Sequence, residues 1–110
     1  MAVKNTVLPI SLSSFNSASL SGTYQAINSG GLEQPCFFLR IVNDSNVDIT
    51  VSFDGTNDNE FIPAGQQFEL NSQSNNRPSN HVANFGKGTT IWIKGNSGTG
   101  LIYLSGYYQI

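Results

Sequence analysis

The segment from Cys36 to Leu70 constrains the fold most, because large apolar side chains alternate along it with a period of two. Residues 37–41 and 49–53 each place an apolar side chain at every second position. This period, together with β-branched and aromatic residues, is typical of half-buried β-strands. No stretch of the chain shows helical spacing, so the sequence predicts an all-β protein.

The two alternating runs predict a β-hairpin over residues 36–53. A three-residue loop, Asp44-Ser45-Asn46, would place Ile41 opposite Ile49 and build one fully apolar face. The register that follows pairs Leu39 with Val51 and Phe37 with Phe53. A slip of one residue would bury polar side chains instead, so we expect this register.

Further strands are expected over residues 7–12, 20–27, 60–62, 67–70, 89–94 and 101–108. Pro9 has no amide to donate, so the first strand should lie at a sheet edge or pair with a neighbouring subunit. Pro63-Ala64-Gly65 fits a type II turn. About seven or eight short strands with turn signals between them predict an antiparallel β-sandwich or jelly roll.

The last two strands are expected to form a second hairpin across the connector 95–100, with Ile93 facing Ile102. Trp92 and Tyr103 would then share the opposite, outward face. Three interpretations of this aromatic pair stay open: cover by another part of the chain, a protein interface, or stacking on a sugar ring.

Length and composition limit the functional classes. The chain has 110 residues, enough for one domain, and we expect residues 1–6 to form an N-terminal arm and 71–88 a long loop. Charged residues make up 11% and the net charge is −2, which argues against nucleic-acid binding. No apolar run is long enough for a membrane helix, and the N-terminal segment does not resemble a signal peptide.

No catalytic, metal or cofactor site is recognisable. Residues 54–60 carry carboxylates and amides that suit calcium, but their spacing differs from an EF-hand, and turn chemistry explains them better. His81 is the only histidine and Cys36 the only cysteine. We interpret Cys36 as a small buried strand residue and not as a nucleophile. The sequence therefore predicts no enzyme and no cofactor.

Two segments carry a resemblance to a known class of proteins. Residues 41–70, IVNDSNVDITVSFDGTNDNEFIPAGQQFEL, place a strand and an Asn-rich turn before a strand that ends in Ser-Phe-Asp-Gly, followed by Ile-Pro-Ala-Gly. Residues 88–108, GTTIWIKGNSGTGLIYLSGYY, add an aliphatic strand, a Gly-Thr-Gly turn and a strand rich in tyrosine. This pattern covers about half of the chain and resembles small structural proteins of tailed-bacteriophage particles.

The resemblance implies a virion component, as a capsid decoration protein or a protein of the neck, collar or tail, made in the bacterial host cytoplasm. Its partners would be other virion proteins (major capsid, portal/neck or tail subunits) and further copies of itself, with no nucleic acid or membrane. The alternative is a carbohydrate- or receptor-binding module of a phage particle. The residues expected at an interface are Val7, Leu8, Ile10, Arg77, His81, Trp92 and Tyr103.

Overall fold

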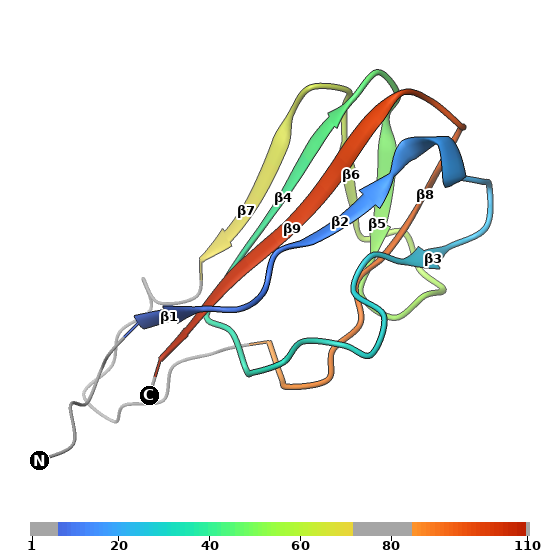
Figure 1. Cartoon of the computed structure of the whole chain (residues 1–110). Coiled ribbons are helices and arrows are strands. Elements are labelled where there is room, and N and C mark those ends of the chain that lie inside the picture. The colour runs from blue at the N-terminus through green and yellow to red at the C-terminus, as the bar shows by residue number, and fades with distance from the viewer. Residues whose placement is uncertain (1–6, 72–84, 110) are drawn as a thin grey trace, which may run out of the picture.

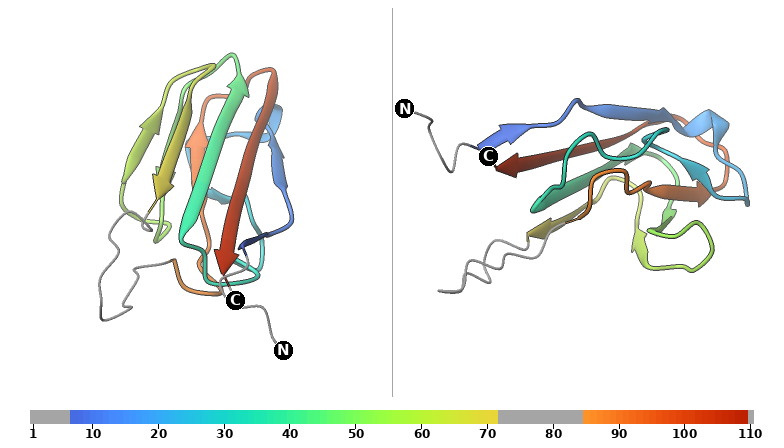
Figure 2. Two further views of the ribbon diagram at one scale, coloured as in Figure 1. Left: turned by 90° about the vertical axis from the view of Figure 1, so that its left-hand side faces the viewer. Right: turned by 90° about the horizontal axis from the view of Figure 1, so that it is seen from below.

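The computed structural model describes residues 7–71 and 85–109 as two antiparallel β-sheets stacked on one another (Figures 1 and 2). Sheet A has the strand order β1-β9-β4-β7, and β2 also pairs with β9; sheet B has the order β3-β8-β5-β6. The strands are β1 (Val7–Pro9), β2 (Ser13–Asn16), β3 (Gln25–Ala26), β4 (Phe38–Ser45), β5 (Ile49–Ser52), β6 (Glu60–Ile62), β7 (Gln67–Asn71), β8 (Trp92–Gly95) and β9 (Gly100–Gln109). A short 3₁₀ helix, η1 (Ser17–Ser19), follows β2.

The prediction of an all-β antiparallel sandwich is confirmed. The described residues form nine strands, because the first predicted strand shortens to β1 and the polar stretch after it forms β2. The strand predicted over 20–27 is reduced to β3, whereas Glu60–Ile62 forms β6 as expected.

The core lies between the two sheets and is built almost wholly from aliphatic side chains. Inward-pointing residues of both sheets meet there. Burial of each large apolar side chain stabilises the fold by about 1.5–3 kcal/mol. Its fully buried members from the strands include Leu39 and Ile41 of β4, Ile49 and Val51 of β5, Ile62 of β6, Ile93 of β8, and Ile102 and Leu104 of β9. The inward positions that the period of two predicted within these strands are therefore correct.

The predicted hairpin between residues 36–42 and 47–53 is wrong. β4 pairs with β9 and β7 in sheet A, whereas β5 pairs with β8 and β6 in sheet B. Ile41 and Ile49 are both buried, but they face the core from opposite sheets. An apolar period of two predicts which side chains point inward. It does not tell whether two such strands pair within one sheet or pack against each other from opposite sheets.

A buried asparagine stabilises the corner where the chain passes from β4 to β5. The Asn43 side-chain nitrogen donates to the carbonyl oxygens of Val47 (2.8 Å), Ile62 (3.0 Å) and Pro63 (3.2 Å). Its side-chain oxygen accepts a hydrogen bond of 2.5 Å from Ser45. The side chain thus supplies hydrogen bonds to backbone carbonyls at the corner, where the chain passes from one sheet to the other.

The second predicted hairpin is also wrong, because β8 lies in sheet B and β9 in sheet A. Ile93 pairs with Val51 and Gln25, while Ile102 pairs with Asn43 and Phe15. Residues 96–99 therefore connect two sheets and do not close a hairpin.

The turn at residues 63–66 confirms the expected role of Gly65, whose φ is +75°. The Gln66 amide donates to the Pro63 carbonyl at 3.0 Å, which places Ala64 and Gly65 at the two central positions. Pro63 therefore occupies the first position of the turn, and not the second as the sequence suggested.

Pro9 lies in β1 at the edge of sheet A, as its missing amide predicted. The next residue, Ile10, donates its amide to the Gly106 carbonyl at 3.0 Å. Because adjacent residues of an antiparallel strand turn their polar groups to opposite sides, the Pro9 nitrogen points away from β9. Proline therefore costs no ladder hydrogen bond at this position and removes a donor from the free edge.

Candidate interface surfaces

The outer face of sheet A carries a row of aromatic and aliphatic side chains. Cross-strand pairing places Val42 beside Tyr103, and Phe38 beside Tyr107, on the face that points away from the core. Leu101 continues the row at one end and Val7 at the other. We call this surface the sheet A face; its apolar members are Val7, Phe38, Val42, Leu101, Tyr103 and Tyr107.

The end of the sheet A face near β1 is hollowed. The hollow has a volume of about 350 Å³ and is lined by Val7, Phe37, Phe38 and Tyr107. The rings of Phe38 and Tyr107 lie 5.7 Å apart between centroids, with an angle of 50° between their planes. Val7 is 49% exposed and Tyr107 is 39% exposed, so these apolar groups are open to solvent. Exposed apolar patches of this kind mark interaction surfaces in soluble proteins.

Polar groups on the same face are already paired with one another. Arg40 donates two hydrogen bonds to the Gln67 side-chain oxygen, of 3.1 and 2.7 Å, and its Nε lies 3.9 Å from a Glu69 carboxylate oxygen. Arg40 of β4 is therefore paired with residues of β7, on the side of β4 away from β9.

The structure spreads the predicted interface residues over several surfaces. Val7 is exposed and Leu8 is half-buried in β1, whereas Ile10 packs against the core of its own chain. Tyr103 lies half-buried on the sheet A face. Arg77 and His81 lie outside the described residues, as does Val82 within the predicted long loop.

Trp92 and Tyr103 do not form the outward pair that the sequence suggested. Trp92 belongs to β8 of sheet B, so the two side chains lie on opposite sheets. The loop after β5 lies over Trp92: an added Cβ at Gly55 would sit 3.1 Å from the indole ring. Trp92 is half-buried under this loop, which supports cover within the chain for this residue.

The loop over Trp92 is held by the turn chemistry that the sequence favoured over calcium. One Asp54 carboxylate oxygen accepts hydrogen bonds from the amides of Thr56 and Asn57 (2.8 Å each) and from the Ser52 hydroxyl (2.8 Å). These donors, the Asn57 amide first, hold the pKa of Asp54 well below its usual range. Within residues 7–71 and 85–109, no group of three or more His, Cys, Asp or Glu side chains could hold a metal ion.

A polar cluster on the outer face of sheet B joins this loop to the strands. The Tyr24 hydroxyl donates to an Asp58 carboxylate oxygen, and Lys94 Nζ lies 3.1 Å from the same oxygen. Lys94 also lies 4.6 Å from the centre of the Tyr24 ring, in a cation–π contact. The hydrogen bond from Tyr24, together with Lys94, lowers the pKa of Asp58. Burial, followed by the bond to Asp58, raises the pKa of Tyr24 to about 12.

Phe61 is the exposed aromatic residue that sequence reasoning missed. It is 59% exposed on β6, beside Thr50 on the outer face of sheet B. The signal was present in Glu60-Phe61-Ile62, because an inward Ile62 requires its neighbour Phe61 to point outward. An open hollow of about 320 Å³ lies next to its ring, lined by Thr50, Asp58, Asn59, Glu60 and Phe61.

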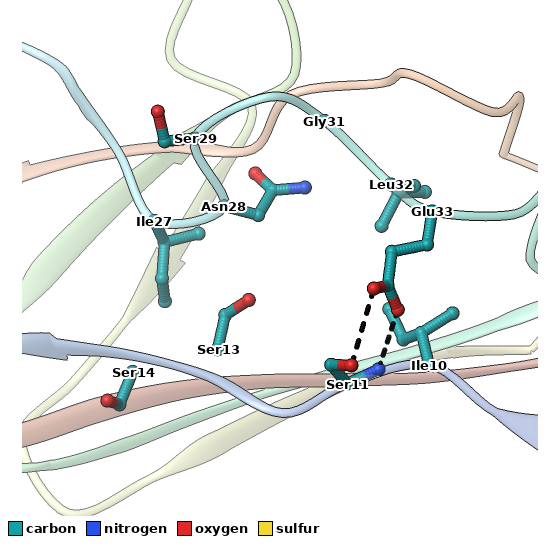
Figure 3. A pocket seen from close by; sticks show the side chains of 10 residues that line it. All are labelled: Ile10, Ser11, Ser13, Ser14, Ile27, Asn28, Ser29, Gly31, Leu32 and Glu33. Atoms are coloured by element: carbon teal, nitrogen blue, oxygen red, sulfur yellow. Dashed lines mark hydrogen bonds between the residues drawn. The ribbon is translucent and has the colours of Figure 1, made fainter.

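A third hollow, of about 270 Å³, lies at the seam between the sheets, where the segment from Ile10 to Ser14 faces residues 27–33 (Figure 3). The Glu33 carboxylate accepts hydrogen bonds from the Ser11 amide (2.9 Å) and hydroxyl (3.3 Å). The buried Asn28 side chain accepts from the Ile91 amide at 2.7 Å and donates to the Thr89 carbonyl at 3.1 Å. Glu33 and Asn28 thus serve to join neighbouring segments of the chain.

Cys36 is fully buried, as its interpretation as a small strand residue predicted. It forms an isolated antiparallel bridge with Phe85, and the two amides donate to each other's carbonyls at 2.8 and 2.7 Å. Burial raises the pKa of its thiol, with a smaller contribution from Glu33. A neutral, inaccessible thiol is a poor nucleophile.

Comparison with known proteins relates this fold to a bacteriophage capsid. A chain in the acidic stable capsid structure of Helicobacter pylori bacteriophage KHP30 matches with a TM-score of 0.51 and 12% sequence identity. The match covers 98% of this chain and 90% of that chain, so the two share their fold over nearly their whole length. No protein-family model and no curated protein sequence matches the chain. No helix among the described residues is long and apolar enough to cross a membrane.

Proposed function

We propose that this chain is a structural component of a bacteriophage particle that binds other virion subunits without catalysis. The observation that carries the proposal is the likeness of the whole fold to a chain in a phage capsid structure. That likeness favours the capsid decoration role over the neck, collar or tail, because the neighbour comes from a capsid.

The strand order supports the same proposal. If β1 and β2 are counted as one interrupted strand, the orders β1/β2-β9-β4-β7 and β3-β8-β5-β6 are those of an eight-stranded jelly roll. Jelly rolls are common in viral capsid domains, where two stacked sheets present broad faces and few open edges. We therefore interpret the sandwich as a jelly roll.

The sheet A face is the surface that fits a neighbouring subunit. A stable protein contact buries about 800 Å² on each partner, with aromatic residues enriched at its centre. Phe38, Tyr103 and Tyr107 supply such a centre, and the paired Arg40 and Glu69 lie beside it. Burial of exposed apolar area contributes about 25 cal/mol per Å², which makes the hollow beside Val7 the strongest anchor.

The test is the incorporation of variants into particles. Phage lacking the chain is complemented with the wild-type chain, Tyr107→Ala or Phe61→Ala, and copies per particle are counted by quantitative mass spectrometry of purified virions. We expect many copies of the wild type, at least about tenfold fewer of Tyr107→Ala, and no loss for Phe61→Ala on the opposite sheet. Absence of the wild-type chain from particles would refute the proposal.

A further inference from the structure

Phe61 and the hollow beside it form a surface that differs in kind from the sheet A face. The ring is 59% exposed, and its neighbours in the hollow are polar: Thr50, Asp58, Asn59 and Glu60. A volume of about 320 Å³ lies at the lower end of the about 300–1,000 Å³ of small-molecule sites. One flat apolar ring next to several hydrogen-bonding groups suits a ligand with an apolar face and a polar rim.

Two polar groups around the ring are free to bind such a ligand. Within residues 7–71 and 85–109, the Thr50 hydroxyl has no hydrogen-bond partner, and it lies beside Phe61 on the same face of sheet B. Asp58 uses one carboxylate oxygen for both Tyr24 and Lys94, which leaves its second oxygen available. The hollow therefore offers a carboxylate oxygen and a hydroxyl to a ligand rich in O–H groups.

The polar groups are held in place before any ligand arrives. The Asn59 side-chain oxygen accepts a hydrogen bond from the Phe53 backbone amide at 2.9 Å, and the Asn59 backbone amide donates to the Val51 carbonyl at 2.8 Å. Asp58 is fixed by Tyr24 and Lys94, as described above. Preorganisation lowers the entropy lost on binding, so even a small ligand could be held.

We propose that this hollow binds a neutral saccharide, with a pyranose ring stacked on Phe61 and its hydroxyl groups hydrogen-bonded to Thr50 and Asp58. The C–H face of a pyranose is apolar and matches the exposed ring, while its O–H groups match these two polar groups. The Asp58 carboxylate disfavours acidic sugars by repulsion and desolvation, because the nearby Lys94 already pairs with it.

The site goes beyond the proposed virion role, although the two are compatible. A subunit attached through the sheet A face would turn the outer face of sheet B, on the other side of the sandwich, away from its neighbour. The hollow would then face outward from the particle, where cell-surface saccharides are encountered.

The experiment probes the labelled full-length chain on a printed array of neutral oligosaccharides built from hexoses and N-acetylhexosamines, with sialylated and uronic-acid oligosaccharides on the same slide. We expect binding to one or more neutral oligosaccharides and none to the acidic set. Titration of a bound oligosaccharide should show affinity weakened about tenfold or more by Phe61→Ala and by Thr50→Val, with circular dichroism unchanged. Tyr107→Ala should bind as the wild type does.

Two outcomes would overturn the saccharide site. One is the absence of binding to every neutral oligosaccharide on the array. The other is binding that folded Phe61→Ala retains at full strength, which would place the ligand elsewhere. Either result leaves the virion role standing, because particle incorporation is measured separately with Tyr107→Ala.

Discussion

The side-chain amide of Asn43 in sheet A donates a hydrogen bond of 3.0 Å to the carbonyl of Ile62 in sheet B. Asn43 is fully buried, and the same nitrogen serves two further carbonyls at the corner after β4. We expect Asn43→Leu, which keeps the branched shape of the side chain but removes its donor and acceptor, to lower the free energy of unfolding by about 3 kcal/mol. Urea denaturation followed by circular dichroism measures this change.

The matched control for this substitution is Asn96→Leu, in the exposed connector between β8 and β9. Asn96 is exposed and makes no hydrogen bond with its side chain among the described residues. Its replacement should change the free energy of unfolding by less than about 0.5 kcal/mol. If Asn43→Leu were equally harmless, the amide would not stabilise the corner between the sheets.

Gly55 has a φ of +79° and lies against the indole ring of Trp92. We expect Gly55→Ala to destabilise the fold by about 1–2 kcal/mol, because alanine at positive φ is strained and its methyl group would press on the indole at 3.1 Å. Trp92 is the only tryptophan, so its fluorescence emission should shift as the loop moves away.

Gly22→Ala is the control for this effect, since nothing lies within 4 Å of a Cβ at Gly22. Its emission spectrum and urea midpoint should match those of the wild type. An unshifted emission spectrum in Gly55→Ala would mean that the loop does not cover Trp92 in solution.

The sequence allowed prediction of the inward side chains but not of the strand neighbours. Leu39, Ile41, Ile49 and Val51 are all buried as their alternation required. The connection from β4 to β5, however, crosses between the sheets, and the buried Asn43 side chain bonds backbone carbonyls at that corner. An asparagine in a polar turn gives no sign, from the sequence alone, that it will be buried between two sheets.

The same lack of information about strand neighbours explains why two of the predicted interface residues were wrongly placed together. Trp92 and Tyr103 were expected together only because a hairpin between β8 and β9 was assumed, and the crossover separates them. Alternation along β9 puts Tyr107 on the same face as Tyr103, but the hollow that Tyr107 forms with Val7 and Phe38 depends on long-range pairing of β1 and β4 with β9. Local periodicity carries no information about such pairing.

The single thiol provides a direct measure of core integrity. Cys36 is fully buried beside its bridge to Phe85, and burial raises the pKa of its thiol. We expect no reaction with a disulfide reagent in the native protein at pH 7 to 8, and one thiol per chain in denaturant. Ser14→Cys, at an exposed position of β2, should react at once and supplies the positive control. Rapid native reaction of the wild type would contradict the burial of Cys36.

The pairing of Tyr24 with Asp58 should be visible in an alkaline titration. Burial and the bond to Asp58 raise the pKa of Tyr24 to about 12 from its usual 10.0. Because the folded state holds this proton more tightly than the unfolded state, the associated stability is complete below pH 10 and is lost as the pH rises towards 12. Tyrosinate absorbance of the native protein should therefore include a late step near pH 12 that belongs to Tyr24.

Two substitutions assign that late step. Tyr24→Phe should abolish it, whereas Asp58→Asn should move it to lower pH but leave it above 10, because the larger cause of the raised pKa, burial, remains. Tyr103→Phe is the matched control, since it removes a half-buried tyrosine from the opposite sheet and should leave the late step intact. A late step that survives Tyr24→Phe would show that another tyrosine carries it, and the contact between Tyr24 and Asp58 would then not hold in solution.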